Sequence, residues 1–343
     1  MVHDERLSVV VLGSSGFVGR HVCEAFAGGG ADVLGVARSE APPGAAAPTV
    51  RLDLSRASRR QVAALLRERA ADVVVNAAGA VWGVTDDQLT SSNVELTGRV
   101  VDALSTLERP PRLVHLGSVH EYGVGAPGTA LTEEHPTRPA GRYGHSKLLA
   151  TRAVLDAVRE RELDAVVLRI SNVCGPHAPR ASLLGMIATH LAAVARHPGG
   201  AAAAPLRLSP LRAHRDFVDV RDVGRAVVAA VAAPLDAAGP DQRVVNIGSG
   251  NAVSVRQLVD RLIALSGLDG SVVEEYEAAD GRPGAEWQRV DITRARRLLG
   301  WLPRCPLDQS LRDLLAAAVP PPPEPDASIR AQVIVEPGPG ASR

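Results

Sequence analysis

Short apolar runs alternate with amphipathic stretches through the first half of the chain. Nearly continuous apolar runs occur at residues 7–12, 32–37, 73–75, 113–116 and 166–170. Strands buried on both faces of a parallel sheet carry such runs. The three- and four-residue apolar spacing of helices occurs between them, at 58–69, from Asn93 onward and at 141–161. This alternation predicts an α/β fold with a parallel sheet.

Beyond residue 175 the alternation becomes less regular. Helical spacing recurs at 183–194, 220–233 and 255–265, and an apolar run at 244–247 predicts one more strand. We therefore expect residues 1–175 to form one domain, to which residues 213–250 partly return, and residues 176–318 to form a smaller mixed α/β region. Proline and small residues dominate from Pro320, so we expect residues 319–343 to be disordered.

The composition argues against several classes of protein. Aromatic residues make up only 3% of the chain, so the core must be built from Ala, Val and Leu. A formal net charge of zero, with no basic block, argues against a nucleic-acid partner. Three widely spaced cysteines lack metal-ligand and disulfide spacing, which predicts no metal and a reducing cytoplasm. An apolar strand starts close to Met1 and no apolar run reaches membrane length, so we expect neither a signal peptide nor a membrane segment.

A glycine-rich turn follows the first predicted strand. Gly13, Gly16 and Gly19 are spaced G-x-x-G-x-x-G, and a helical pattern follows them. Glycines at such a turn let the backbone approach a dinucleotide pyrophosphate, which the N–H groups and dipole of the helix then hold. A tight turn without a ligand is the alternative.

The second predicted strand ends at Ala37-Arg38-Ser39. NAD enzymes of this type usually carry an acid at the end of this strand to hold the ribose 2′-hydroxyl. Asp32 lies at the start of the strand, whereas Arg38 is placed to face a 2′-phosphate. We therefore expect NADPH rather than NAD, the alternative being that Arg38 is merely solvated.

Lys147 is the only lysine in 343 residues. Tyr143 lies four residues before it on a predicted helix, so both side chains share one face. An ammonium beside a phenol is expected to lower the tyrosine pKa, which suits proton exchange with a ketone or an alcohol. Ser118 ends a predicted strand and is expected in the same crevice, because ligands bind beyond the carboxyl ends of parallel strands. An ordinary surface pair on an amphipathic helix is the alternative.

Nine short motifs occur in the order typical of one family: G-S-S-G-F-V-G (13–19), D-L (53–54), N-A-A-G (76–79), G-S (117–118), Y-G-H-S-K (143–147), S-N-V-C-G-P (171–176), R-D-F-V-D-V-R-D-V (215–223), N-I-G-S-G (246–250) and L-L-G-W (298–301). They cover about residues 7 to 315. The chain resembles an extended short-chain dehydrogenase/reductase of the NAD-dependent epimerase/dehydratase family, whose members modify nucleotide sugars.

The resemblance implies a doubly wound Rossmann domain for the cofactor and a smaller mixed α/β C-terminal domain for a nucleoside-diphosphate sugar. It gives the catalytic roles to Ser118, Tyr143 and Lys147. Asn172, Arg215 and Arg282 fall where members of the family contact the substrate diphosphate, and the alternative for each arginine is a surface ion pair. The implied cofactor contacts are Gly13, Ser15, Gly16, Phe17, Val18, Gly19, Arg38, Asp53, Leu54, Ala77, Ala78, Gly79, Asn93, Tyr143 and Lys147. A homodimer formed by two helices of each chain is common in the family and is expected here.

The residues after Ser118 bear on the reaction. Family members that are 4,6-dehydratases carry an acid and a base directly after the catalytic hydroxyl, but Val119 cannot be an acid. The run is more similar to the Ser-x-x-Glu-Tyr-Gly of reductases that act on 4-keto-6-deoxy sugar nucleotides. Within it, His120 is expected either to orient or protonate the sugar, or simply to pack against its neighbours. We therefore predict that the protein uses NADPH to reduce the 4-keto group of a 4-keto-6-deoxyhexose linked to a nucleoside diphosphate. We expect this nucleotide to be dTDP. A 4-epimerase with bound NAD and a non-catalytic NADP-binding sensor are the alternatives.

Overall fold

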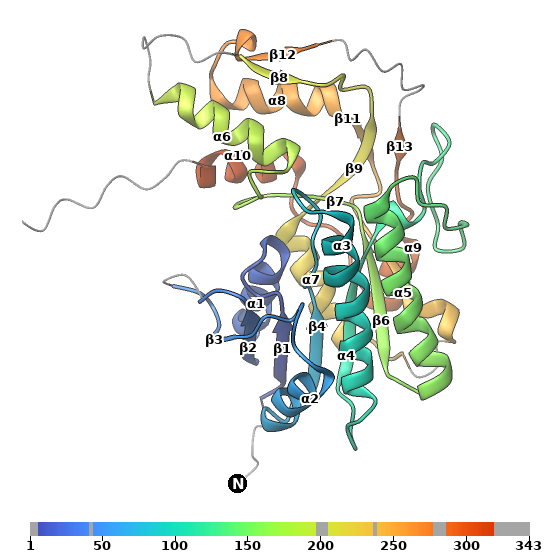
Figure 1. Cartoon of the computed structure of the whole chain (residues 1–343). Coiled ribbons are helices and arrows are strands. Elements are labelled where there is room, and N and C mark those ends of the chain that lie inside the picture. Colours follow the sequence, from blue (N-terminus) through green and yellow to red (C-terminus); the bar gives the residue numbers. More distant parts are fainter. Residues whose placement is uncertain (1–5, 41–43, 197–204, 236–238, 277–285, 319–343) are drawn as a thin grey trace, which may run out of the picture.

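The computed structural model describes residues 6–40, 44–196, 205–235, 239–276 and 286–318 (Figure 1). Arg282 and the proline-rich tail, 319–343, therefore lie outside the described residues. The strands are β1 (Ser8–Leu12), β2 (Asp32–Ala37), β3 (Thr49–Arg51), β4 (Val73–Asn76), β5 (Arg112–Ser118), β6 (Ala165–Ile170), β7 (Asn172–Cys174), β8 (Leu206–Leu208), β9 (His214–Asp219), β10 (Val244–Ile247), β11 (Ala252–Ser254), β12 (Val273–Glu275) and β13 (Trp287–Gln288).

The helices are α1 (Phe17–Gly28), α2 (Arg59–Glu68), α3 (Asp86–Leu89), α4 (Leu96–Leu104), α5 (Arg142–Arg161), α6 (Leu183–Ala195), α7 (Val220–Ala232), α8 (Val255–Ser266), α9 (Thr293–Leu299) and α10 (Leu307–Ala318). Short helical turns of other types are η1 (Thr90–Glu95), η2 (Val119–Glu121), η3 (Pro240–Arg243) and η4 (Gly270–Val272).

A seven-stranded parallel sheet in the order β10-β6-β5-β4-β1-β2-β3 is the centre of the described fold. Successive side chains of a strand point to opposite faces, so each strand feeds two cores. Val9 and Val11 pack with α1 and α7, whereas Val10 and Leu12 pack with α2, α4 and α5. Both faces are thus covered by helices, which explains the continuous apolar runs and confirms the predicted doubly wound fold.

A second region lies beyond the carboxyl ends of the central strands (Figure 1). Strands β11, β9 and β13 form a small sheet, which β7 joins by pairing with β9, and β8 pairs with β12. Helices α6, α8 and α10 share a separate apolar core. Of residues 213–250, α7 and β10 pack with the central sheet while β9 belongs to the second one. Strand β7 belongs to this second sheet although it lies before residue 175. The expected domain boundary at residue 175 stays a prediction.

The helix expected to begin at Asn93 begins earlier. Helical residues run without a break from α3 through η1 to α4, and Asn93 lies inside the π-helical turn η1. Thr85 caps this segment with Gln88 in a reciprocal capping box, a start signal that the apolar spacing did not reveal. Among the described residues, no helix is long and apolar enough to span a membrane.

Candidate active site

The glycine-rich turn is packed so closely that larger residues do not fit. Gly13 has a φ of +83°, and a Cβ on it would lie 2.8 Å from the backbone of Ala78. A Cβ on Gly19 would lie 2.1 Å from the Gly13 carbonyl oxygen. Helix α1 begins after Gly16 without a side-chain cap, so its first N–H groups are free for an anion. The turn, with Ser15 exposed at its tip and Phe17 opening the helix, fits a dinucleotide pyrophosphate.

Arg38 and Asp53 lie at the carboxyl ends of β2 and β3. Arg38 is exposed. The pKa of Asp53 is lowered first by a hydrogen bond from the Ser55 hydroxyl and further by the positive charge of Arg38. An exposed guanidinium at this place fits a 2′-phosphate. Leu54 is buried in the core on the α2 side, so the structure gives this predicted contact a packing role.

Asn93 joins the end of β4 to the helix that carries Tyr143. Its Oδ1 accepts a hydrogen bond from the Ala80 N–H (2.9 Å), and its Nδ2 donates to the Ala80 carbonyl (3.0 Å) and to the Ser146 hydroxyl (2.9 Å). A Cβ on Gly79, which follows Ala77 and Ala78, would lie 2.7 Å from Oδ1, so a larger residue here would displace the Asn93 side chain from its hydrogen bonds. The structure supports a positioning role for Asn93, and a contact with the cofactor stays a prediction.

Ser118, Tyr143 and Lys147 come together at the carboxyl end of β5. Ser118 is the last residue of β5, and its side chain lies next to that of Tyr143 near the start of α5. A Cβ on Gly144 would lie only 2.4 Å from the His120 carbonyl oxygen. Glycine at this position therefore allows α5 to approach η2 and to bring the tyrosine to the serine.

The expectation that Lys147 lowers the pKa of Tyr143 is wrong for this structure. Burial raises the Tyr143 pKa to about 12, although the neighbouring Ser118 hydroxyl opposes this change. Lys147 is itself buried, donates a hydrogen bond to the Leu116 carbonyl, and has its pKa lowered to about 8 by desolvation. The loss of water thus dominates the Tyr143 pKa, and the phenol is held protonated.

Three of the four predicted substrate residues are among the described residues, and one of them, His120, contacts this group. The ring of His120 lies edge-on to that of Tyr143 with centroids 5.8 Å apart, and its pKa is lowered to about 4 by burial and by Arg215. Asn172 starts β7 and donates to the Asp216 carbonyl oxygen (2.9 Å). Arg215 on β9 forms an ion pair with Glu286. Arg282 lies outside the described residues, so its role stays a prediction.

The sequence-based interpretation missed the buried support of Ser118. The fully buried Glu121 accepts hydrogen bonds from the Ser118 N–H (2.8 Å), the Thr151 hydroxyl (3.0 Å) and the Arg169 Nε (2.8 Å). The guanidinium of Arg169 lies 4.5 Å from the ring centre of Tyr122. Glutamate three residues after Ser118 is a capping-box signal that could have revealed part of this. The Glu-Tyr pair of the reductase-like motif is therefore structural here.

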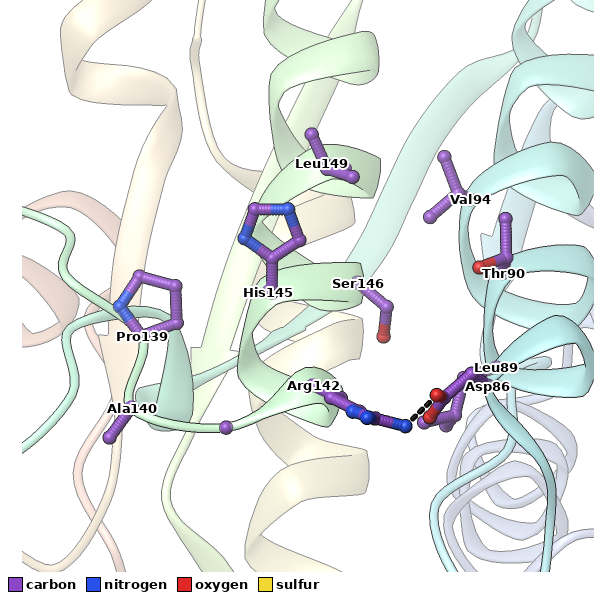
Figure 2. Close-up of a pocket in the computed structure, with 11 residues that line it drawn as sticks. Asp86, Leu89, Thr90, Val94, Pro139, Ala140, Arg142, His145, Ser146 and Leu149 are labelled. Carbon is purple, nitrogen blue, oxygen red and sulfur yellow. Dashed lines mark ion pairs between the residues drawn. The ribbon is translucent and has the colours of Figure 1, made fainter.

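A cavity of about 600 Å³ lies between α5 and the α3–η1 segment (Figure 2). Leu89, Val94 and Leu149 line it, and Figure 2 shows an ion pair between Arg142 and Asp86 across one end. Ser118, Tyr143 and Lys147 do not line this cavity, so it is separate from the catalytic group. Among the described residues, no cluster of three His, Cys, Asp or Glu side chains could hold a metal ion.

Comparisons with known proteins agree with this geometry. A family model, described as the NAD dependent epimerase/dehydratase family, matches residues 9–248. A dTDP-6-deoxy-L-talose 4-dehydrogenase (NAD(P)(+)) from Kitasatospora kifunensis is 43% identical over 92% of this chain and 96% of its own. A UDP-glucose 4-epimerase from Azospirillum brasilense is 30% identical over 86% of this chain and 87% of its own.

A solved structure, that of UDP-glucuronic acid 4-epimerase from Bacillus cereus in complex with NAD, superposes with a TM-score of 0.76. It is 20% identical, covers 91% of this chain and 98% of its own, and supports the fold. The motif order, the doubly wound sheet and the Ser118–Tyr143–Lys147 group all agree with the match of the family model. The chain therefore belongs to the NAD-dependent epimerase/dehydratase family, as its motifs predicted.

Proposed function

We propose that this protein reduces the 4-keto group of a dTDP-4-keto-6-deoxyhexose with NADPH. The observation that carries the proposal is the group of Ser118, Tyr143 and Lys147 at the carboxyl end of β5, in which Ser118 and Lys147 are buried and Tyr143 is half-buried. The name of the relative from Kitasatospora kifunensis describes dehydrogenation at position 4 of a dTDP-6-deoxyhexose. Reduction of the corresponding ketone is the reverse of that reaction.

The protonation state of Tyr143 suits reduction. Bound NADPH supplies a hydride for the carbonyl carbon. The Ser118 hydroxyl binds the carbonyl oxygen, and its backbone is held by Glu121. With a pKa raised to about 12, Tyr143 carries a proton at neutral pH and gives it to the alkoxide that forms on this oxygen. Lys147 lies one turn further along α5, and its ammonium lies near the carboxyl end of β5. From this position it would donate hydrogen bonds to the ribose hydroxyls of the cofactor.

Elimination of water, as a dehydratase requires, has little support at this site. It needs an acid and a base beside the sugar. Val119 is buried and apolar, His120 is neutral because its pKa is lowered to about 4, and Glu121 is fully buried in its pair with Arg169. None of these three residues offers a free carboxyl group, which favours simple proton and hydride transfer.

A 4-epimerase is the second candidate, because the relative from Azospirillum brasilense is a UDP-glucose 4-epimerase. The test is to follow NADPH absorbance while the purified protein acts on dTDP-4-keto-6-deoxyhexoses. A reductase consumes NADPH in proportion to the alcohol formed. An epimerase interconverts two sugar nucleotides without net loss of NADPH, and a non-catalytic sensor binds NADPH without product. Either of the last two outcomes would overturn the proposal.

We also propose a cytoplasmic homodimer in which the continuous segment η1–α4 and helix α5 of one copy pack against those of a second copy. Leu149 and Val94 supply apolar surface on this side of the molecule, where the cavity of Figure 2 lies. Free thiols at Cys23, Cys174 and Cys305 suit a reducing compartment. Light scattering from wild type and from Leu149→Glu tests the dimer, since the added charge should favour the monomer.

A further inference from the structure

A chain of side-chain amides connects His120 to the backbone of the second sheet. Asn172 Nδ2 donates to the Asp216 carbonyl oxygen at 2.9 Å and to Gln288 Oε1 at 3.5 Å. Gln288 Nε2 lies 3.4 Å from His120 Nδ1. Gln288 belongs to β13 and is buried, although it lies 168 residues from His120 in sequence. Nothing in the local sequence around either residue reveals the contact.

The direction of these hydrogen bonds determines which nitrogen of His120 carries hydrogen. A backbone carbonyl can only accept, so the Asn172 amide must turn its NH₂ group towards Asp216. The second hydrogen of this NH₂ group then points to Gln288, which must present its oxygen. Gln288 consequently turns its own NH₂ group to His120 Nδ1, which accepts. In a neutral imidazole the other nitrogen, Nε2, then carries the hydrogen.

The ring of His120 is held neutral and lies in the reaction crevice. Burial and the nearby Arg215 lower the His120 pKa to about 4, so the ring is uncharged at neutral pH. It lies edge-on to Tyr143 and follows Ser118 by two residues. No described residue forms a hydrogen bond with Nε2 of His120, whereas its backbone N–H and its Nδ1 both have partners. A neutral donor is therefore available next to the two residues that bind the carbonyl oxygen.

We propose that Gln288 locks His120 as the Nε2–H tautomer, and that this N–H donates to the hydroxyl on C3 of the sugar. The substrate part of the proposal rests on the proposed function. Ser118 and Tyr143 take the oxygen on C4. Of the two carbons beside C4, C5 bears the methyl group of a 6-deoxy sugar, and C3 bears the hydroxyl that can accept. His120 and Gln288 together then select sugars that carry oxygen at C3.

The tautomer is measured first, by ¹⁵N-histidine NMR of the wild-type protein, with His120→Asn to assign the signals. We expect protonated Nε2 and unprotonated Nδ1. Gln288→Glu replaces the donor by an acceptor, so Nδ1 should become protonated and the His120 pKa should rise. Exposed His145 serves as the unaffected reference. A proton on Nδ1 in wild type, or an unchanged pattern in Gln288→Glu, overturns the lock.

The substrate part is measured by steady-state kinetics of wild type and Gln288→Met on a dTDP-4-keto-6-deoxyhexose and its 3-deoxy analogue. Loss of one oriented neutral hydrogen bond should raise KM for the 3-hydroxy substrate about 3- to 10-fold with little change in kcat. KM for the 3-deoxy analogue should stay unchanged. An equal rise for both substrates indicates a merely structural role and overturns this part. If neither substrate is reduced, the proposed function fails while the NMR result still decides the tautomer.

Discussion

Replacing Lys147 by methionine should abolish turnover and yet stabilise the cofactor-free protein at neutral pH. Burial lowers the Lys147 pKa from its ordinary value of 10.5 to about 8. A tenfold change in proton affinity is worth about 1.4 kcal/mol, so carrying the charge costs the native state about 3 kcal/mol. Methionine has a similar length, but it leaves the Leu116 carbonyl without its donor, at a cost of about 1 kcal/mol. The expected net gain at pH 7 is about 2 kcal/mol.

The gain should disappear at high pH. Below pH 8, Lys147 is charged in both the folded and the unfolded protein, and the full cost is present. Between pH 8 and 10.5 the folded protein has lost this proton while the unfolded chain keeps it, so the wild type becomes more stable as pH rises. At pH 10.5 and above, only the lost hydrogen bond should remain, and Lys147→Met should be about 1 kcal/mol less stable than wild type.

Urea unfolding at pH 7 and pH 10.5 measures both differences. Cysteines and tyrosines also titrate over this range, but the two proteins share them, so their effects cancel in the difference. Arg152→Met removes an exposed charge from the same helix and should change stability by less than about 0.5 kcal/mol at either pH. A less stable Lys147→Met at pH 7, or a difference that does not vary with pH, would refute the reasoning.

Three further substitutions test the site. Tyr143→Phe should lower kcat about 10²- to 10⁴-fold in the NADPH assay while the melting temperature and NADPH binding stay unchanged, and intact turnover would exclude Tyr143 as the proton donor. Arg38→Ala should weaken NADPH binding about 10- to 150-fold in titration calorimetry and leave NADH binding unchanged; equal losses would mean that Arg38 does not contact the 2′-phosphate. Glu121→Ala leaves the Arg169 charge buried and unpaired, so it should lower the free energy of unfolding by about 3–5 kcal/mol in urea, and a loss below about 1 kcal/mol would contradict the buried pair.

The helices and strands of the central sheet could be predicted from the sequence because their signals are local. Apolar runs mark strands covered on both faces, and β10 was predicted with the bounds that the structure shows. The spacing of Tyr143 and Lys147 places them on one helical face, and the position of Ser118 at a strand end places it in the same crevice. These inferences need only the geometry of a helix, a strand and a parallel sheet.

The electrostatic state of the site depends on contacts between distant segments. Whether Lys147 lowers the tyrosine pKa or burial raises it depends on how closely α5 packs against β5 and η2, which no local pattern contains. Glu121 meets Arg169 across 48 residues, and Gln288 meets His120 across 168. The residue types and spacing determine which groups are available for proton transfer, whereas the packing of the two sheets determines their water exposure, their partners and therefore their charge.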